Sequence, residues 1–291
     1  MKKTLFTGVA TALATPFTSD GINLEEFRKF IDFQIDSGID ALVVCGTSGE
    51  ATTMTPKEKE LLIKCAIETS NKKVPIIVGT GSNNTNIAIE NSIMAEKLGA
   101  DGLLVVTPYY NKTTQLGLYE HFKSISSSVS IPIILYNVPS RTGINIEPET
   151  CFKLSKISNI VGIKEASGNI SQIAKISQLC GEELPVYSGN DDQIVPILAL
   201  GGKGVISVLS NIKPILARKI TDYFFENHID DSCYYQLQAL PLINCLFAET
   251  NPIPVKAALN MLGFNFGTPR LPLVECTSEL KEKIQKYLYE S

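Results

Sequence analysis

The 291-residue sequence contains no tryptophan and two histidines, His121 and His228. A catalytic zinc centre usually takes several histidine or cysteine ligands, and both histidines fall in stretches with a helical, polar pattern. The seven cysteines are scattered and include no Cys-x-x-Cys pair, so we interpret them as reduced thiols that mostly fill the core. We expect no cofactor and no metal site, although counting residues leaves open a Mg²⁺ ion held by carboxylates.

The sequence also has no excess of basic residues. It contains 26 Lys and Arg and 30 Asp and Glu, which give a formal net charge of -4. A nucleic-acid-binding surface would need a basic stripe, and we find none. No apolar run reaches membrane-spanning length, and residues 1–7 carry two lysines without the apolar segment of a signal peptide. We therefore expect no nucleic acid or membrane partner, and a cytoplasmic location.

The sequence does contain a regular alternation of short β-branched apolar runs and amphipathic stretches, up to about residue 227. Helix starts are marked by Asn23 and by Thr55-Pro56-Lys57-Glu58, which has the features of a capping box. Eight strand-then-helix units favour an α/β fold, a (β/α)8 TIM barrel. The alternative is an open doubly wound sheet, which usually has fewer strands and a glycine-rich fingerprint after the first. We expect the strands at residues 8–13, 41–45, 76–79, 103–107, 133–136, 160–164, 186–187 and 204–208.

Beyond the eighth unit only helical patterns remain, near residues 233–250, 254–262 and 278–289. No linker or low-complexity tract separates them from the preceding units. We therefore expect a catalytic barrel domain at residues 1–227 and a C-terminal helical extension at residues 228–291, packed on the barrel.

Lys164 interrupts an apolar strand, Ile160-Val161-Gly162-Ile163. Lysine is seldom buried. Where it is, desolvation disfavours the charged form, and a neutral amine can form a Schiff base with a carbonyl substrate. Lys164 is therefore our candidate nucleophile. From this segment alone an equal alternative is a lysine at the strand end, with its ammonium group in solvent or paired with a carboxylate such as Glu165.

Other candidate residues follow the strands, whose C-terminal ends carry the active site in a barrel. The turn Gly46-Thr47-Ser48-Gly49 offers backbone N–H groups and two hydroxyls to a carboxylate. Tyr136 could relay protons, and Arg141 could bind a second carboxylate. Asp191 and Asp192 disfavour phosphate binding after strand seven. Taken one at a time, these residues also fit an ordinary turn, a core tyrosine and a surface arginine.

Three segments together carry a family resemblance: Gly46-Thr47-Ser48-Gly49-Glu50, Tyr136-Asn137-Val138-Pro139-Ser140-Arg141-Thr142-Gly143 and Gly162-Ile163-Lys164-Glu165-Ala166. In this order they resemble the dihydrodipicolinate synthase and N-acetylneuraminate lyase superfamily, which are pyruvate-dependent class I aldolases that form a Schiff base. The resemblance extends from Gly8 to Lys256. Arg141 favours a branch whose second substrate has a carboxylate, since the sialic-acid lyases lack this arginine.

The resemblance implies a lyase that condenses pyruvate with L-aspartate 4-semialdehyde to 4-hydroxy-tetrahydrodipicolinate, the committed step of diaminopimelate and lysine biosynthesis. It also implies a homotetramer built as a dimer of dimers, with one tyrosine of each subunit reaching into the neighbouring site. The implied catalytic residues are Lys164 as the imine-forming lysine and Tyr136, Thr47 and Tyr110 as a proton relay, Tyr110 being the exchanged tyrosine. The implied substrate-binding residues are Thr47, Ser48, Arg141, Gly189 and the carbonyl of Ile206.

Three alternatives remain at this point. An aldolase that cleaves a 2-keto-3-deoxy sugar acid would use the same Lys164 and Tyr136. A metabolite-binding relative without turnover would not need Lys164, Tyr136 and Thr47 intact. A pyridoxal phosphate enzyme also forms a lysine imine, but the acidic loop after strand seven offers little to a phosphate.

One departure from the family concerns feedback by lysine. Relatives that lysine inhibits bind it at the dimer interface with Asn, Glu, Tyr and His side chains. Asn83 and Tyr109 match this set, but Ile87 replaces the glutamate and Pro56 replaces the histidine. Losing the anionic partner of an ammonium group costs about 1.5 to 3 kcal/mol. We therefore expect weak or absent inhibition by lysine.

Overall fold

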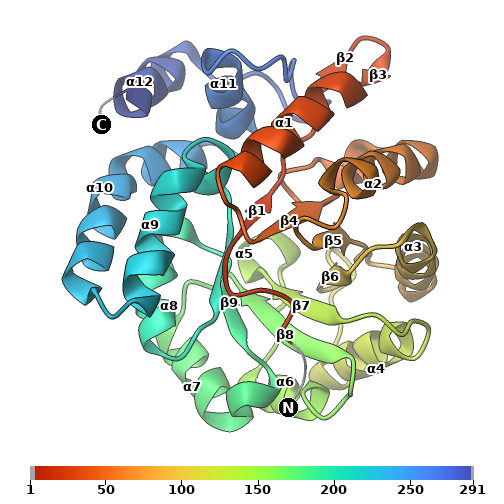
Figure 1. Cartoon of the computed structure of the whole chain (residues 1–291). Helices are drawn as coiled ribbons and strands as arrows, with labels where there is room; N and C mark the ends of the chain where they lie inside the picture. Colours follow the sequence, from red (N-terminus) through yellow and green to blue (C-terminus); the bar gives the residue numbers. More distant parts are fainter. Residues whose placement is uncertain (1–3, 290–291) are drawn as a thin grey trace.

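Eight parallel strands close into a barrel in the order β1, β4, β5, β6, β7, β8, β9 and β10, with β10 paired back to β1 (Figure 1). The computed structural model describes residues 4–289. The expected (β/α)8 barrel is therefore confirmed. Its strands are β1 (Gly8–Ala12), β4 (Ala41–Val44), β5 (Ile76–Gly79), β6 (Gly102–Val106), β7 (Ile133–Asn137), β8 (Ile160–Glu165), β9 (Val186–Ser188) and β10 (Gly204–Ser207).

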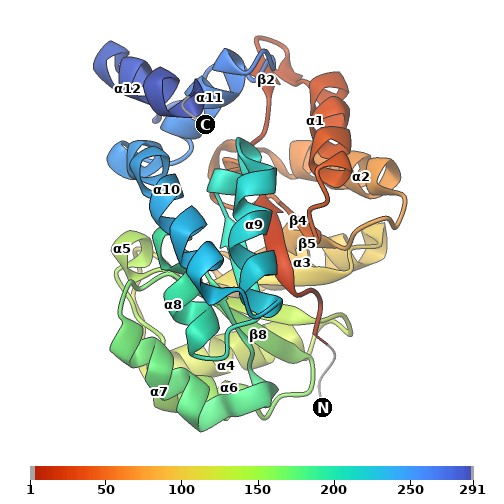
Figure 2. The ribbon, with the colours of Figure 1, turned by 60° about the vertical axis from the view of Figure 1, so that its left-hand side comes forward.

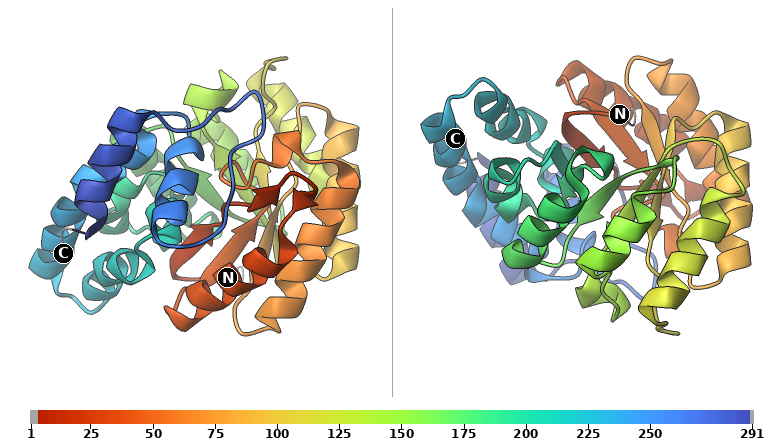
Figure 3. Two further views of the ribbon diagram at one scale, coloured as in Figure 1. Left: turned by 90° about the horizontal axis from the view of Figure 1, so that it is seen from above. Right: turned by 90° about the horizontal axis from the view of Figure 1, so that it is seen from below.

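Helices surround the strands and continue beyond them (Figures 1 and 3). Asn23 and Thr55 cap their helices as expected, and Glu58 completes the capping box. The α-helices are α1 (Leu24–Asp36), α2 (Pro56–Ser70), α3 (Thr85–Leu98), α4 (Gln115–Ser126), α5 (Pro139–Thr142), α6 (Pro148–Leu154), α7 (Ile170–Cys180), α8 (Ile194–Ala199), α9 (Pro214–Phe225), α10 (Ile229–Ala248), α11 (Ile253–Met261) and α12 (Ser278–Tyr289). Short 3₁₀ turns are η1 (Ala51–Thr53), η2 (Gly181–Glu183), η3 (Asp191–Gln193) and η4 (Leu209–Asn211).

The C-terminal extension begins with α10, which packs against α9, and continues with α11 and α12 (Figure 2). The segment between α11 and α12 reaches a small antiparallel hairpin, β2 (Phe17–Thr18) with β3 (Gly21–Ile22), which the sequence pattern did not predict. There the N–H of Phe17 donates to the carbonyl of Phe266 at 3.1 Å. The boundary between residues 227 and 228 stays a prediction.

Alternate side chains of the strands enter two separate apolar cores. Ala10, Val43 and Ile134 point into the barrel, whereas Val9 and Leu42 belong to the layer between strands and helices. This alternation explains why each strand reads as an uninterrupted apolar run, because both of its faces are buried. Within residues 4–289, no helix combines the length and apolarity that crossing a bilayer requires.

The surroundings of His121 differ from the expected polar ones. This residue lies on α4 and is 6% exposed. Its Nδ1 is 2.9 Å from the hydroxyl of Thr85, and burial lowers its pKa to about 4. His228, at the start of α10, is exposed. The seven cysteines are free thiols and all except Cys233 are buried, which confirms that they mostly fill the core.

Candidate active site

A cavity of about 160 Å³ lies at the carboxyl ends of the barrel strands. Its walls come from the strands and following loops and from the C-terminal extension. Six of the predicted residues line it together: Thr47, Ser48, Tyr136, Arg141, Lys164 and Gly189. The convergence that the sequence predicted at the strand ends is thus present in the structure.

Lys164 enters this cavity because β8 is irregular. Ile133 on β7 pairs with Ile160, but the next residue, Ile134, pairs with Gly162, so Val161 is the extra residue of a bulge. Ile160 packs outside the barrel, and strict alternation from it would turn Lys164 outward as well. The bulge restores the inward direction, a known use of bulges beside active sites.

Lys164 is 5% exposed and lies beside Tyr136, which is 7% exposed. The two residues are register partners on neighbouring strands, and the Lys164 nitrogen is 4.6 Å from the centre of the tyrosine ring. The alternative of a solvated lysine at the strand end is therefore excluded. The absence of a side chain at Gly189 makes room here, since a Cβ would lie 3.1 Å from Lys164 Cε.

Glu165 points away from the cavity and is fully buried. Its carboxylate accepts hydrogen bonds from Asn137 Nδ2 at 2.9 Å, from the Ser167 N–H at 2.7 Å and from Gln172 Nε2 at 3.3 Å. Desolvation raises its pKa, while these donors oppose the shift. Glu165 thus fixes the end of β8 from the outer side and is not an ion-pair partner of Lys164.

The loop Gly46–Glu50 follows β4 and brings Thr47 and Ser48 to the cavity. The Thr15 hydroxyl donates to the Gly49 carbonyl at 2.8 Å, and the Glu50 N–H donates to the Thr47 carbonyl at 3.1 Å. Such a tight turn directs hydroxyl and backbone donors toward one point, an arrangement suited to a small carboxylate.

Asn251, in the C-terminal extension, is a site residue that the sequence reasoning did not identify. It is 5% exposed and lines the cavity, and its Nδ2 donates to Ser48 Oγ at 3.0 Å. Arg141, which is exposed, donates from its guanidinium to the Asn251 carbonyl at 3.3 Å. The only sequence signal was that Asn251 lies within the part of the chain, from Gly8 to Lys256, over which the family resemblance extends.

Two predicted residues lie apart from this group. Tyr110 has a side chain that is 93% exposed and a φ of 70°, a left-handed conformation that is uncommon for a tyrosine. Ile206 is fully buried inside the barrel on β10. Neither residue is among those that line the two cavities of the described chain, so their assigned roles stay predictions.

A larger cavity of about 460 Å³ adjoins the first and shares Thr47, Tyr136 and Arg141 with it. Tyr109, Ile87 and Lys59 complete its rim. Within residues 4–289, no cluster of three or more His, Cys, Asp or Glu side chains could hold a metal ion. The residues that line the two cavities include the basic residues Lys164, Arg141 and Lys59 and no carboxylate, which suits anionic ligands.

Comparison with known proteins agrees with this geometry. The model of the Dihydrodipicolinate synthetase family matches residues 5–291. The 4-hydroxy-tetrahydrodipicolinate synthase 1 of Clostridium acetobutylicum is 58% identical over 269 residues, 92% of each chain, and the synthase of Acetivibrio thermocellus is 51% identical over 99% of each chain. A crystal structure of dihydrodipicolinate synthase from Thermotoga maritima superposes with a TM-score of 0.97 at 43% identity, covering 99% of both chains. The chain therefore belongs to the dihydrodipicolinate synthetase family.

Proposed function

We propose that the protein condenses pyruvate with L-aspartate 4-semialdehyde to 4-hydroxy-tetrahydrodipicolinate, as a lyase of diaminopimelate and lysine biosynthesis. The observation that carries this proposal is a buried lysine, Lys164, in one small cavity with Tyr136 and Thr47. Relatives named for this activity, at 51% and 58% identity over nearly the whole chain, support it.

The chemistry begins with pyruvate bound through its carboxylate to Thr47 and Ser48. The amine of Lys164 attacks the keto carbon, water leaves, and an imine forms. The imine acidifies the pyruvate methyl group, which gives up a proton through the relay that contains Tyr136 and Thr47. The resulting enamine attacks the aldehyde carbon of the second substrate. The amine of that substrate then displaces Lys164 by transimination and closes the ring.

Arg141 binds the carboxylate of the aldehyde substrate. Its guanidinium is exposed at the cavity rim and carries two parallel donors suited to a carboxylate. Gly189 leaves space beside Lys164 for the imine carbon, and we assign the carbonyl of Ile206 to the lining of the substrate pocket, as the family resemblance implies.

Tyr110 completes the proton relay of a neighbouring subunit. A tyrosine with 93% of its surface exposed, at a backbone with φ of 70°, lines neither of the two cavities of its own subunit described above, and its exposure leaves it accessible to a neighbouring subunit. The working unit is then at least a dimer, and we propose a homotetramer of two such dimers. The seven free thiols fit a location in the reducing cytoplasm.

The decisive experiment is borohydride reduction in the presence of pyruvate, followed by digestion and mass mapping. We expect one reduced pyruvyl adduct on Lys164 and none in the Lys164→Met variant. Lys256 is an internal control, because it is also buried but lines neither cavity of the described chain. An adduct on Lys256, or none at all, would contradict the mechanism. Turnover of a 2-keto-3-deoxy sugar acid without turnover of aspartate semialdehyde would contradict the substrate assignment.

A further inference from the structure

A buried ion pair joins the loop Gly46–Glu50 to the C-terminal extension. Lys256 on α11 places its ammonium nitrogen 2.9 Å from Glu50 Oε1, and the two side chains are 1% and 0% exposed. Neither side chain is among the residues that line the two cavities described above. The pair therefore has no direct contact with the substrates.

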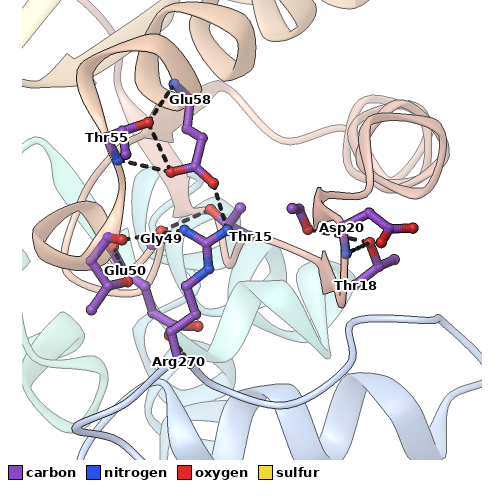
Figure 4. A network of polar contacts seen from close by, with 10 residues as sticks. Thr15, Thr18, Asp20, Gly49, Glu50, Thr55, Glu58 and Arg270 are labelled. Carbon is purple, nitrogen blue, oxygen red and sulfur yellow. Dashed lines mark hydrogen bonds and ion pairs between the residues drawn. The ribbon is translucent and has the colours of Figure 1, made fainter.

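Both oxygens of the Glu50 carboxylate are used. Oε1 accepts from Lys256, and Oε2 accepts from the backbone N–H of Arg270 at 2.8 Å. Figure 4 shows the Arg270 side chain reaching from the C-terminal segment to the carboxylate of Glu58 on α2. The ammonium group of Lys256 also donates to the Thr268 carbonyl at 3.1 Å and lies 4.4 Å from the centre of the Phe17 ring. Fixed partners on several sides hold the pair in one geometry.

Glu50 is rigidly connected to the residues proposed to bind the pyruvate carboxylate. Its φ of 55° is left-handed, a conformation that side chains with a Cβ disfavour, so the loop needs outside contacts to keep it. The Glu50 N–H donates to the Thr47 carbonyl at 3.1 Å. A shift of Glu50 would therefore move Thr47 and Ser48.

The same stretch of the C-terminal extension also contacts the loop Gly46–Glu50 at a second residue. Asn251 donates to Ser48 Oγ at 3.0 Å, only two residues before Glu50 in the loop. Asn251 and Lys256 thus hold neighbouring loop residues from one short segment at the start of α11. A buried ion pair is by itself a weak source of stability compared with an apolar pair of the same shape. What the pair of Lys256 and Glu50 adds to an ordinary core contact is therefore a fixed orientation of the Glu50 side chain.

We propose that Lys256 is a positioning residue, which acts through Glu50 to hold Thr47 and Ser48 where they bind the carboxylate of pyruvate. This inference rests on the proposed function, because it takes the loop to be the carboxylate-binding element. It makes the C-terminal extension a working part of the active site.

The test compares Lys256→Met, Glu50→Gln and the double variant in the full-length protein. The matched control is Arg218→Met, which removes a cation from partly buried ion pairs with Asp40 and Asp222 at the N-terminal end of the strands. For each variant the KM for pyruvate, the KM for aspartate semialdehyde, kcat and the denaturant midpoint are measured. Borohydride trapping as a function of pyruvate concentration reports binding at Lys164 independently of turnover.

In Lys256→Met we expect the KM for pyruvate and the concentration for half-maximal trapping to rise about 10- to 100-fold, the scale of loss from misplaced binding groups. The KM for the aldehyde should change far less. The double variant has no unpaired buried charge, so we expect its stability to recover while its KM for pyruvate stays raised. Arg218→Met should lose stability without a selective effect on pyruvate.

The proposal is overturned if folded Lys256→Met keeps the wild-type KM for pyruvate, or if that KM returns to the wild-type value together with stability in the double variant. If Lys256→Met does not fold, the KM of Glu50→Gln for pyruvate tests the same proposal. Glutamine keeps the size of the side chain and an acceptor for the Arg270 N–H. Failure of the wild-type protein to trap pyruvate would instead refute the proposed function.

Discussion

The side-chain nitrogen of Lys164 lies 4.6 Å from the centre of the Tyr136 ring, and the two residues are register partners on the adjacent strands β7 and β8. An imine formed on Lys164 therefore has a phenol as its immediate neighbour inside a nearly closed site. A group in this position can carry protons to and from the pyruvate carbons without moving out of contact.

This relationship predicts the behaviour of Tyr136→Phe. We expect kcat to fall by about 10²-fold or more, because the proposed proton relay loses the Tyr136 hydroxyl, while pyruvate still becomes trapped on Lys164, though more slowly. Initial rates with both substrates and timed borohydride quenching measure the two effects. Tyr187→Phe is the control, since the Tyr187 hydroxyl donates to the Phe6 carbonyl away from the cavity. A Tyr136→Phe variant with wild-type kcat would contradict the relay.

Arg141 should affect the two substrates unequally. The Arg141→Met variant would lose the proposed charged hydrogen bond to the aldehyde substrate, which is worth about 1.5 to 3 kcal/mol, or about 10- to 100-fold in KM. Trapping of pyruvate should stay close to wild type, because we propose that Thr47 and Ser48 bind the carboxylate of pyruvate. Steady-state kinetics with each substrate varied in turn give the two KM values. The KM of Arg141→Lys for the aldehyde should lie between those of the wild type and of Arg141→Met. Equal rises in both KM values would argue against the assignment.

Substitution of Gly162 tests whether the bulge at Val161–Gly162 orients Lys164. A Cβ there would lie 3.1 Å from Tyr187 Cε2 and 3.2 Å from the Pro185 carbonyl, so Gly162→Ala should lower the free energy of unfolding by about 1 to 3 kcal/mol. Because the bulge turns Lys164 inward, the rate of pyruvate trapping should fall as well. Denaturant unfolding and trapping kinetics measure the two separately. Loss of stability with unchanged trapping would show that the lysine does not depend on this packing.

The barrel and its helices were predictable because their signals are local and periodic. Runs of β-branched residues gave each strand, and capping residues such as Asn23 and Thr55 gave helix starts. The apolar neighbours of Lys164 left its burial and a solvated position at the strand end as equal alternatives, and the residues at the other strand ends favoured burial. The direction of its side chain could not be predicted, since alternation from Ile160 points outward and the bulge that reverses it lies in the pairing of β8 with β7.

The contribution of Asn251 was not predictable for a different reason. It contacts Ser48 across 203 residues of sequence, and no local pattern encodes such a distance. The burial of His121 was also not predictable from the sequence, because a helical pattern with polar neighbours did not reveal that this side chain faces the core. Both misses concern single polar side chains whose burial is decided by tertiary packing.

Inhibition by lysine should be weak or absent. Ile87 and Tyr109 line the larger cavity, so a ligand there would meet an apolar side chain at the position where inhibited relatives have a glutamate. Initial rates at submillimolar lysine measure this directly, and strong inhibition would contradict it. The Ile87→Glu variant supplies an anion for the ammonium group and should bind lysine about 10- to 100-fold more tightly than wild type.

His121 should make the protein progressively less stable in mild acid. Its pKa is lowered by burial from an ordinary value near 6.5 to about 4 in the folded protein. Above pH 6.5 both states are neutral and no penalty exists. Between about pH 6.5 and 4 the unfolded chain binds a proton that the folded protein does not, so the free energy of unfolding should fall by about 2 to 3 kcal/mol.

Denaturant unfolding of wild type and His121→Gln at several pH values between 7 and 4 isolates this effect. The variant should lose some stability at pH 7, because it disturbs the contact with Thr85. Its stability should then depend less on pH than that of the wild type, so that the two curves converge as the pH approaches 4. Parallel curves would mean that His121 gains its proton as readily in the folded protein as in the unfolded chain.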